Sequence, residues 1–500
     1  MDSIANWLII GFTGTFVLGL LILAFMYWQD VHQTAHAIRR NYPVIGRLRY
    51  RFERLGEYFR QYFFANDREE QPFNRALRSW VYRTAKGLGG LISFGSTHNL
   101  NQPGSFIFVN ASFPKLEEEK VSMPPITIGG RCNKPYVAKN VFNISGMSYG
   151  AISRPAVRAL AKGAARAGVW LNTGEGGLSP YHTEFGADII FQIGTAKYGV
   201  RDNQGRLDPV RLQEVGEQVQ AFEIKLSQGA KPGRGGVLPG IKVTEEISRI
   251  RGIPAGQTSS SPNRHRDISN TQQLLESMHY IRELTGRPVG FKAVYGSEQF
   301  PRELCETIHR LGIDYAPDFM TVDGGEGGTG AAPQLLADYV GLSLSESLPM
   351  VVNTLTEYGL RDQVRVIASG KLITSGAVAW ALCMGADFAV TARGFMFALG
   401  CIQSLQCHKD TCPTGITTHN PRLQKGLVVD DKAERVASYA YWVNQEINLL
   451  AHSCGLSNAR EFRREHVRIV QKPGYSIALN ELYPEMPVTA LPKQQFRRPA

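Results

Sequence analysis

Short apolar runs alternate with longer helical segments along most of the chain beyond residue 121. Seven of these runs are expected to form buried strands, at Val137–Ile144, Trp170–Asn172, Ile189–Ile193, Val289–Val294, Phe319–Val322, Val366–Ala368 and Phe388–Thr391. Glycine-rich or polar loops follow them, and the expected helices include Pro155–Ala167, Pro209–Ser227, Thr271–Thr285 and Ala377–Gly385. Alternation of strands, loops and helices over about 300 residues is typical of a parallel α/β fold, and this length fits a (β/α)8 TIM barrel.

A doubly wound sheet is the alternative α/β architecture. It would be expected to carry a G-x-G-x-x-G sequence in its first strand-to-helix turn. The first such turn here starts at Gly146 and reads GMSYGAIS, which does not match that pattern. We therefore expect the barrel, with its active loops at the carboxyl ends of the strands.

The N-terminal segment is a continuous apolar run, Trp7–Trp28, of 22 residues without a charge. At about 1.5 Å per residue, a helix of this length spans a bilayer core of roughly 30 Å, and the aromatic residues at both ends suit the two interfaces. A cleaved signal peptide is the main alternative, with a cleavage-like sequence at Ala35–Ala37, and a buried core helix is another. We expect a single transmembrane anchor at residues 1–30.

Positive charge is concentrated directly after this apolar run. Residues 31–100 contain twelve Lys and Arg against five Asp and Glu, a surplus of seven within the total formal charge of +11. This asymmetry predicts that the N-terminus lies outside and the rest of the chain in the cytoplasm. The arginines could contact anionic membrane lipid or could simply be solvated. A nucleic-acid partner is not expected, because no recognition motif accompanies the charge.

The rest of the chain divides by composition. Residues 31–115 are expected to be a basic helical adapter, with helices around Val44–Phe64 and Asn74–Lys86. The barrel is expected at residues 116–425, followed by a helical extension at residues 426–500. Seven cysteines without an even, regular spacing argue against a disulfide-stapled secreted protein and favour a reducing compartment.

Three of these cysteines, Cys401, Cys407 and Cys412, fall within twelve residues and precede Pro413. Thiolates at such spacing are the usual way in which a loop holds an iron–sulfur cluster. Because the sequence has no fourth cysteine nearby, a three-iron 3Fe-4S cluster, or a four-iron cluster with one open corner, is favoured over a four-cysteine zinc site. The alternative is three unrelated buried thiols.

The run Gly400–Thr418 resembles the three-cysteine cluster loop that follows the flavin domain of glutamate synthases. Five further motifs resemble successive barrel loops of that domain, in the same order: Asn143–Ser153, Asn172–Gly177, Gln228–Val243, Asp323–Pro333 and Ser369–Gly376. The resemblance covers roughly residues 120–425. It implies an FMN cofactor and reduction of 2-iminoglutarate, formed from 2-oxoglutarate and ammonia, by hydride transfer from reduced FMN.

The same resemblance implies a set of flavin contacts. Loops after the seventh and eighth barrel strands commonly bind phosphate, and two such loops here carry glycines beside a cation. Lys292, at the end of an apolar strand, would stabilise the negative charge of reduced flavin. Ordinary turns, a flexible glycine loop and a solvent-directed lysine are the structural alternatives. The expected FMN contacts are Met147, Ser148, Gly150, Lys292, Gly324, Gly325, Gly370, Lys371, Arg393 and Gly394.

Substrate contacts follow from the resemblance as well. Lys231 and Arg251 are similar to the family's contacts with 2-oxoglutarate, since a dicarboxylate needs fixed cations. Glu175 would position substrate and ammonia, so Glu175 and Lys231 are the expected catalytic residues. A solvated lysine, a helix-surface arginine and a capping glutamate are the alternatives. Val237 stands where the family pattern has glutamine, which leaves a different keto acid or amine open as the substrate.

Several parts of a glutamate synthase are not expected in this sequence: the amidotransferase domain, the C-terminal β-helix and a nicotinamide-binding domain. Ammonia would then come from solution or a partner, and electrons from a separate donor such as a ferredoxin or a reductase subunit. We expect a membrane-anchored FMN and iron–sulfur oxidoreductase. The alternatives are a flavin barrel without net redox chemistry, and a tethered electron-transfer subunit with a vestigial pocket.

Overall fold

A computed structural model describes residues 2–488. The chain forms two compact units, residues 1–78 and residues 79–500, and each is described by itself. The boundaries expected from composition, at residues 30, 115 and 425, remain predictions.

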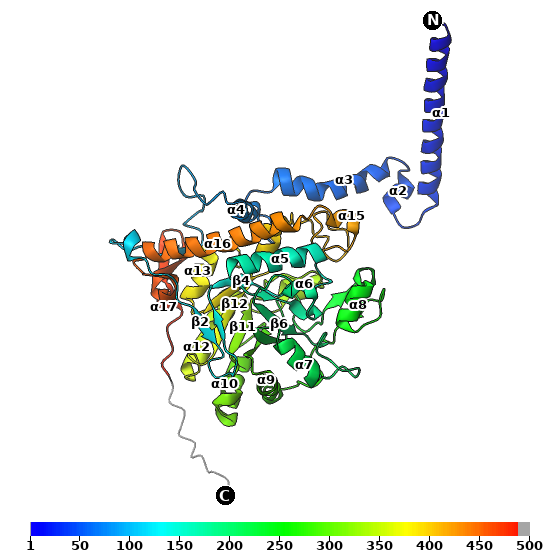
Figure 1. The fold of residues 1–500 in the computed structure, drawn as a ribbon. Helices are drawn as coiled ribbons and strands as arrows, with labels where there is room; N and C mark the ends of the chain where they lie inside the picture. The colour runs from blue at the N-terminus through cyan, green and yellow to red at the C-terminus, as the bar shows by residue number, and fades with distance from the viewer. Residues whose placement is uncertain (1, 489–500) are drawn as a thin grey trace. The chain divides into compact units, whose positions relative to one another are not determined.

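The second unit is built around a closed barrel of eight parallel strands (Figure 1). In chain order these are β4 (Phe142–Ile144), β5 (Leu171–Asn172), β6 (Ile189–Ile193), β7 (Ala221–Lys225), β10 (Val289–Ala293), β11 (Phe319–Asp323), β12 (Arg365–Ser369) and β13 (Phe388–Thr391). The barrel closes where β13 pairs with β4, in the register Val390 with Asn143. The expected (β/α)8 TIM barrel is confirmed.

Helices follow the barrel strands, as the alternation predicted. They are α5 (Arg154–Ala167), α6 (Pro180–Thr183), α7 (Pro209–Gly216), α8 (Glu245–Arg251), α9 (Thr271–Thr285), α10 (Gln299–Leu311), α11 (Gln334–Tyr339), α12 (Leu344–Glu357), α13 (Ser375–Cys383) and α14 (Arg393–Leu399). Helix α5 shows how the local sequence determines where a helix begins and ends. The side chain of Ser153 accepts from the backbone N–H of Ala156, and Gly168 ends α5 in the left-handed region.

One expected strand, Val137–Ile144, is wrong as a single element. It divides into β3 (Tyr136–Ala138) and the barrel strand β4, because β3 instead pairs antiparallel with β2 (Ile126–Ile128). Side chains of this hairpin pack with residues at the amino ends of barrel strands, such as Trp170, Phe319 and Phe388. The hairpin therefore closes the amino-terminal end of the barrel with a hydrophobic core.

The expected helix Pro209–Ser227 is wrong in its second half. Helix α7 ends at Gly216, and the segment AFEIK forms β7, the fourth barrel strand in chain order. All five residues of β7 are buried, including Glu223 and Lys225. Two charged residues in a segment of five are typical of an exposed helix. Here both side chains have polar partners inside the barrel or at its mouth, which offset the cost of burying their charges.

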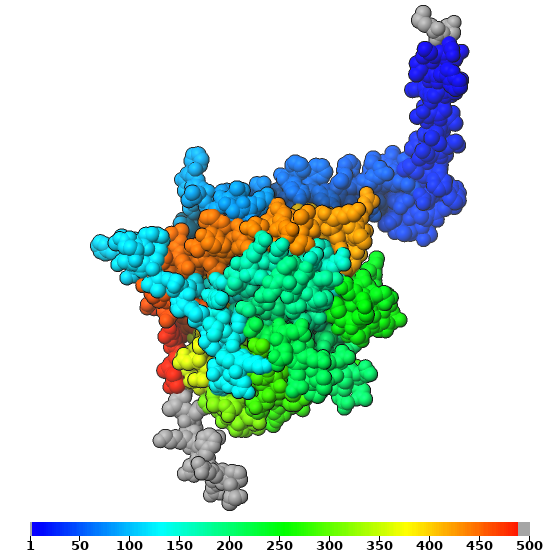
Figure 2. Space-filling view, viewed as in Figure 1, coloured from blue at the N-terminus to red at the C-terminus, as the bar shows by residue number. Residues whose placement is uncertain are grey.

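The C-terminal region is only partly helical. It contains α15 (Pro421–Gln424), α16 (Val429–Ser453) and α17 (Leu479–Leu482), together with the hairpin β14 (Val467–Lys472) and β15 (Tyr475–Ala478). Helix α16 packs along α5 (Figures 1 and 2). Strand β14 also pairs with β1 (Phe106–Phe108), which completes a three-stranded sheet. The end of the expected extension, residues 489–500, lies outside the described residues.

The remaining elements are short. The strands β8 (Val237–Leu238) and β9 (Ser259–Ser260) form a two-stranded ribbon. Single turns of 3-10 helix lie at Glu117–Glu119, Gly174–Gly176, Gly240–Lys242, Ile313–Tyr315, Ala459–Glu461 and Arg464–His466.

The first unit contains α1 (Asp2–His32), α2 (Ala37–Asn41), α3 (Gly46–Phe59) and a π-helical turn (Arg60–Phe64), and α4 (Arg75–Ala85) spans the boundary between the units. The two helices expected between residues 44 and 86 are confirmed. Helix α1 is long and apolar enough to cross a membrane, by length and composition alone, and none of its apolar window is buried by other parts of residues 2–488.

Candidate functional site

A cavity lies at the carboxyl ends of the barrel strands, the position of the active site in TIM-barrel enzymes. The structure brings seven of the sixteen expected site residues to its wall: Met147, Ser148, Glu175, Lys231, Arg251, Arg393 and Cys407. The other nine do not line it: Gly150, Lys292, Gly324, Gly325, Gly370, Lys371, Gly394, Cys401 and Cys412.

Glu175 is held between two lysines. Its Oε1 lies 3.0 Å from Nζ of Lys225, at the end of β7, and 3.7 Å from Nζ of Lys231. Two glycines make room for the carboxylate, since a Cβ on Gly194 or Gly236 would lie within 3 Å of Glu175. Burial raises the pKa of Glu175, but the two lysines outweigh burial and bring it to about 2. The carboxylate is therefore ionised at neutral pH.

Arg251 reaches the same cavity from the end of α8. Its Nη2 donates to the backbone oxygen of Tyr149 at 2.9 Å, and its guanidinium lies 5.2 Å from the ring centre of Tyr198. The Nε–H group is buried and has no hydrogen-bond partner among the described residues. A buried guanidinium with a free donor at a cavity wall is suited to an anionic ligand.

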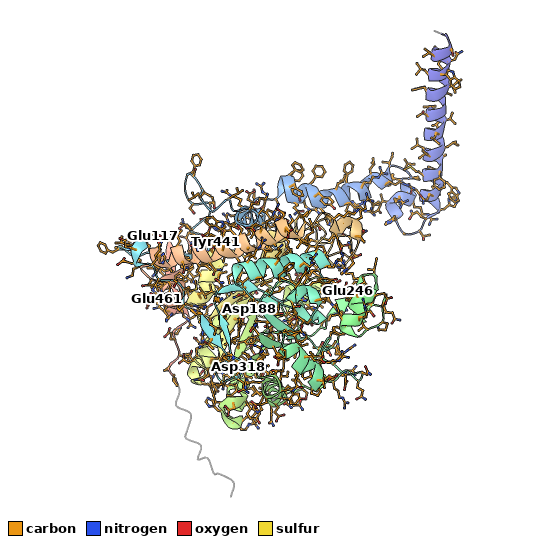
Figure 3. The ribbon with its side chains drawn as sticks, in the orientation of Figure 1. Glu117, Asp188, Glu246, Asp318, Tyr441 and Glu461 are labelled. Atoms are coloured by element: carbon orange, nitrogen blue, oxygen red, sulfur yellow. The ribbon has the colours of Figure 1, made fainter. Side chains whose placement is uncertain are left out.

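Glu246 orients the loop that carries Met147 and Ser148. It lies on α8 (Figure 3) and accepts hydrogen bonds from the hydroxyl groups of Tyr149 and Tyr181, each at 2.6 Å. Glu246 thus joins α8 to the first barrel loop through Tyr149 and to α6 through Tyr181, and the hydrogen bond from Arg251 to Tyr149 is a second contact between α8 and that loop.

Lys292 lies inside the barrel mouth and does not reach solvent. It is 7% exposed, and its Nζ lies 3.3 Å from Oδ1 of Asp323. The second oxygen of Asp323 accepts from the backbone N–H of Gly229. A smaller interior cavity is lined by Lys292, Asn172 and Glu223 among others. A solvent-directed lysine is therefore excluded, and the ammonium is held at the carboxyl end of β10.

Close packing between loops explains the glycines at positions 324, 325 and 370. A Cβ on Gly324 would lie 2.8 Å from the backbone nitrogen of Leu344, and one on Gly325 would lie 2.5 Å from the backbone oxygen of Gly341. Gly370 has φ of +147° and sits against Gly324. These contacts pack the loop after β11 on itself and against the loop after β12, which is one of the two loops, after β12 and β13, where phosphate was expected.

The three cysteines surround Arg393, the first residue of α14. Cys401 and Cys412 are buried and Cys407 is partly buried, with its Sγ 3.7 Å from Nη1 of Arg393. Burial lowers the pKa of Arg393, but its proximity to all three cysteines outweighs burial and raises it. Its guanidinium also donates to the backbone oxygen of Thr329.

Lys242 fixes the cysteine loop to the barrel. It is 1% exposed, and its Nζ donates to the backbone oxygens of Thr417 at 2.6 Å, Cys407 at 2.8 Å and Ala151 at 3.3 Å. A buried ammonium that joins three separate segments is costly to desolvate, so its contacts must be well formed.

The sequence model for the conserved region in glutamate synthase matches residues 97–457. The chain belongs to the glutamate synthase family. It is 39% identical to the glutamate synthase large subunit-like protein YerD of Bacillus subtilis, over 96% of this chain and 99% of that one. It is also 35% identical to the archaeal-type glutamate synthase [NADPH] of Thermotoga neapolitana, over 68% of this chain. There it spans 64% of the relative's length.

Solved structures that align with this chain include a mutant flavocytochrome b2 with benzoylformate. The identity is 13% and the TM-score 0.47, and the alignment covers 90% of this chain and 93% of that one. A mandelate oxidase structure has 16% identity and a TM-score of 0.45, covering 78% of this chain and 98% of that one. The expected glutamate synthase-like oxidoreductase is confirmed at the level of the family.

The candidate site and the barrel interior beside it also contain residues that the sequence did not single out. Lys225 pairs with Glu175, and Glu223 accepts inside the barrel from Asn172, Gln192 and Thr321 at 2.6 to 2.9 Å. Both lie on β7, the strand taken for a helix. A charged residue at the end of a buried strand was the signal that drew attention to Lys292, and it would have found Lys225 if the strand had been recognised.

Iron–sulfur ligation remains a prediction for this member of the family. Among residues 2–488, no group of three or more His, Cys, Asp or Glu side chains is placed closely enough to hold a metal ion. The three cysteines nevertheless share one loop, and each interacts electrostatically with the same partly buried arginine, Arg393. Three soft thiols beside a fixed cation fit an anionic iron–sulfur cluster.

Proposed function

We propose that the chain is an FMN-dependent oxidoreductase that converts a 2-oxo acid and ammonia into an amino acid by way of the 2-imino acid. The keto acid and ammonia condense with loss of water, and the imine then accepts a hydride and a proton. 2-Oxoglutarate is the proposed keto acid and glutamate the product.

The arrangement of charge around Glu175 is the observation that carries this proposal. Three cations, Lys225, Lys231 and Arg251, surround a single carboxylate at the cavity, so the site retains positive charge. A dicarboxylate substrate would supply the missing negative charge. The free Nε–H of Arg251 is a donor that such a substrate would satisfy.

Each of these residues has a distinct proposed part. Lys231 and Arg251 bind the substrate carboxylates, and Glu175, as an ionised carboxylate, accepts hydrogen bonds from ammonia or the imine nitrogen. Burial lowers the pKa of Lys231 despite the nearby Glu175. That shift favours release of a proton from Nζ. Lys231 is therefore suited to donate the proton that the imine accepts together with the hydride.

FMN would supply the hydride when bound. Lys292 supports its fit, because a buried ammonium at a strand end can stabilise the negative charge of reduced flavin. The proposed contacts are those expected from the sequence: Met147, Ser148, Gly150, Lys292, Gly324, Gly325, Gly370, Lys371, Arg393 and Gly394. For Arg393 we propose a backbone contact, since its side chain is directed to Thr329 and Cys407.

Cys401, Cys407 and Cys412 would hold an iron–sulfur cluster, of the 3Fe-4S type. A separate donor, a ferredoxin or a reductase subunit, would deliver electrons. We also propose that α1 anchors the chain in a membrane, with the catalytic barrel in the cytoplasm, on the basis of its apolar sequence and the basic residues that follow it.

The test is product formation by the full chain, purified in detergent without oxygen. With reduced methyl viologen as donor, 2-oxoglutarate and isotopically labelled ammonium should yield labelled glutamate. Pyruvate and 2-oxobutyrate, which carry one carboxylate, serve as comparisons because they cannot bridge Lys231 and Arg251. Bound FMN without amino-acid formation from any of these acids would contradict the proposed function.

A further inference from the structure

Helix α3 and the π-helical turn after it carry a continuous apolar face. Its residues recur at intervals of three and four positions, which places them on one side of a helix. They are Ile45, Leu48, Phe52, Leu55, Phe59, Tyr62 and Phe63. Every one is exposed, Phe52 by 66% and Phe63 by 75%, so nothing in residues 2–78 covers this face.

Two arginines border the apolar face of this helix. Arg49 and Arg51 flank the face on its two sides, whereas Glu53, Glu57 and Arg54 lie on the opposite side. Between residues 37 and 64 there are seven arginines and two glutamates. An apolar face bordered by arginine is the pattern of a helix that lies in the interface of an anionic membrane.

Asp30 ties the start of α3 to the end of the apolar helix α1. Its carboxylate is fully buried and accepts from Nε of Arg39 at 2.8 Å, Nε of Arg47 at 2.7 Å and the backbone N–H of Val44 at 2.9 Å. Arg47 also donates to Gln29 at 2.6 Å. The first turn of α3 is therefore held within a few ångströms of the last turn of α1. Within this unit α3 then runs across the axis of α1 (Figure 1).

We infer that the apolar face of residues 45–63 lies on the surface of an anionic membrane, at the end where α1 leaves the bilayer. The Asp30 contacts place α3 at the level of the lipid headgroups. There its aromatic side chains can enter the acyl region while Arg49 and Arg51 meet lipid phosphates. This inference rests on the proposed membrane insertion of α1.

Photocrosslinking on the full chain tests the inference. p-Benzoylphenylalanine is introduced in place of Phe52, on the apolar face, or Glu57, on the opposite face, and each protein is reconstituted into vesicles of phosphatidylcholine with or without phosphatidylglycerol. A third variant, Phe16→p-benzoylphenylalanine, reports insertion of α1 independently. Adducts are identified by mass spectrometry.

We expect lipid adducts at positions 16 and 52 and few at position 57. The yield at position 52 should be at least about fivefold higher with phosphatidylglycerol present, and the double variant Arg49→Gln, Arg51→Gln should remove that gain. The matched variant Glu53→Gln should preserve it.

Two results would overturn the inference. Lipid adducts at position 16 with protein adducts at position 52, whether to the barrel or to a second copy, would show that the face is a protein interface although the anchor is real. An absence of lipid adducts at both positions would reject the membrane anchor as well as the surface helix.

Discussion

Lys225 and Glu175, fifty positions apart in the chain, form an ion pair of 3.0 Å at the mouth of the barrel. Lys225 ends β7 and Glu175 lies on the loop after β5, and both strands pair with β6, so the parallel sheet brings the two residues to the same end of the barrel. Lys231 approaches the same carboxylate oxygen at 3.7 Å. The negative charge of one carboxylate therefore compensates both lysines. Removing that carboxylate should affect both of them at once.

Glu175→Gln should destabilise the barrel at neutral pH and remove a pH dependence. The pKa of Glu175 lies at about 2, against an ordinary value of 4.5. The stabilisation is present above pH 4.5 and is lost as pH falls towards 2, and it corresponds to about 3 kcal/mol. The midpoint temperature of thermal unfolding should therefore fall less steeply from pH 6 to pH 3 in Glu175→Gln than in the unmodified protein. Adding Lys225→Met should restore part of the lost stability, because it removes one unpaired ammonium.

Lys231→Ala should reduce turnover of the keto acid by about tenfold or more while FMN stays bound, since a buried charged hydrogen bond to a carboxylate contributes about 1.5 to 3 kcal/mol. Steady-state kinetics and flavin absorbance measure the two effects separately. Arg234→Ala is the matched control, because Arg234 lies on the same loop but is exposed. Unchanged kinetics in Lys231→Ala would place the substrate elsewhere.

Cys407→Ser should abolish the visible absorption of an iron–sulfur cluster and leave most of the flavin in place. The thiolate is a cluster ligand that a serine hydroxyl does not replace well. Iron and acid-labile sulfide analysis provides the measurement. Cys454→Ser is the control, since Cys454 is a buried cysteine outside the loop. Full iron and sulfide in Cys407→Ser would refute the assignment of these ligands.

Lys242→Met should loosen the cysteine loop without touching a cysteine. It removes three hydrogen bonds, to Ala151, Cys407 and Thr417, and leaves three carbonyl groups short of a donor. We expect hydrogen exchange of residues 401–418 to accelerate by at least about tenfold, in line with the loss of more than one charged hydrogen bond. Lys409→Met, at a position within the same loop, is the comparison. Equal exchange in both variants would show that Lys242 does not hold the loop.

The sequence predicted the parts of the fold that depend on local periodicity. Seven of the eight barrel strands and the helices between them follow from apolar runs bounded by glycine-rich loops. β7 was missed because Glu223 and Lys225 interrupt its apolar pattern, and their buried partners come from other strands. The division between β3 and β4 was missed for a related reason, because β3 is set by pairing with β2.

The candidate site was predictable where a loop motif carried its residues, as for Glu175, Lys231 and Cys407, and Arg251 was expected on the helix after such a motif. The sequence did not show that Lys225 contacts Glu175, because the contact requires β7, which was taken for a helix, to be a strand two places from β5 in the barrel. The sequence also did not predict that Lys242 is buried. Its three carbonyl partners lie up to 175 positions away from Lys242 in the chain.

The most direct test of the proposed chemistry is the reoxidation of reduced flavin in the full chain without oxygen. Rapid mixing of the reduced protein with 2-oxoglutarate and ammonium should restore the absorption of oxidised flavin, at a rate that depends on both compounds and is much lower in Lys231→Ala. Reoxidation that needs neither compound, or none while flavin remains bound, would contradict a site that reduces a 2-imino acid.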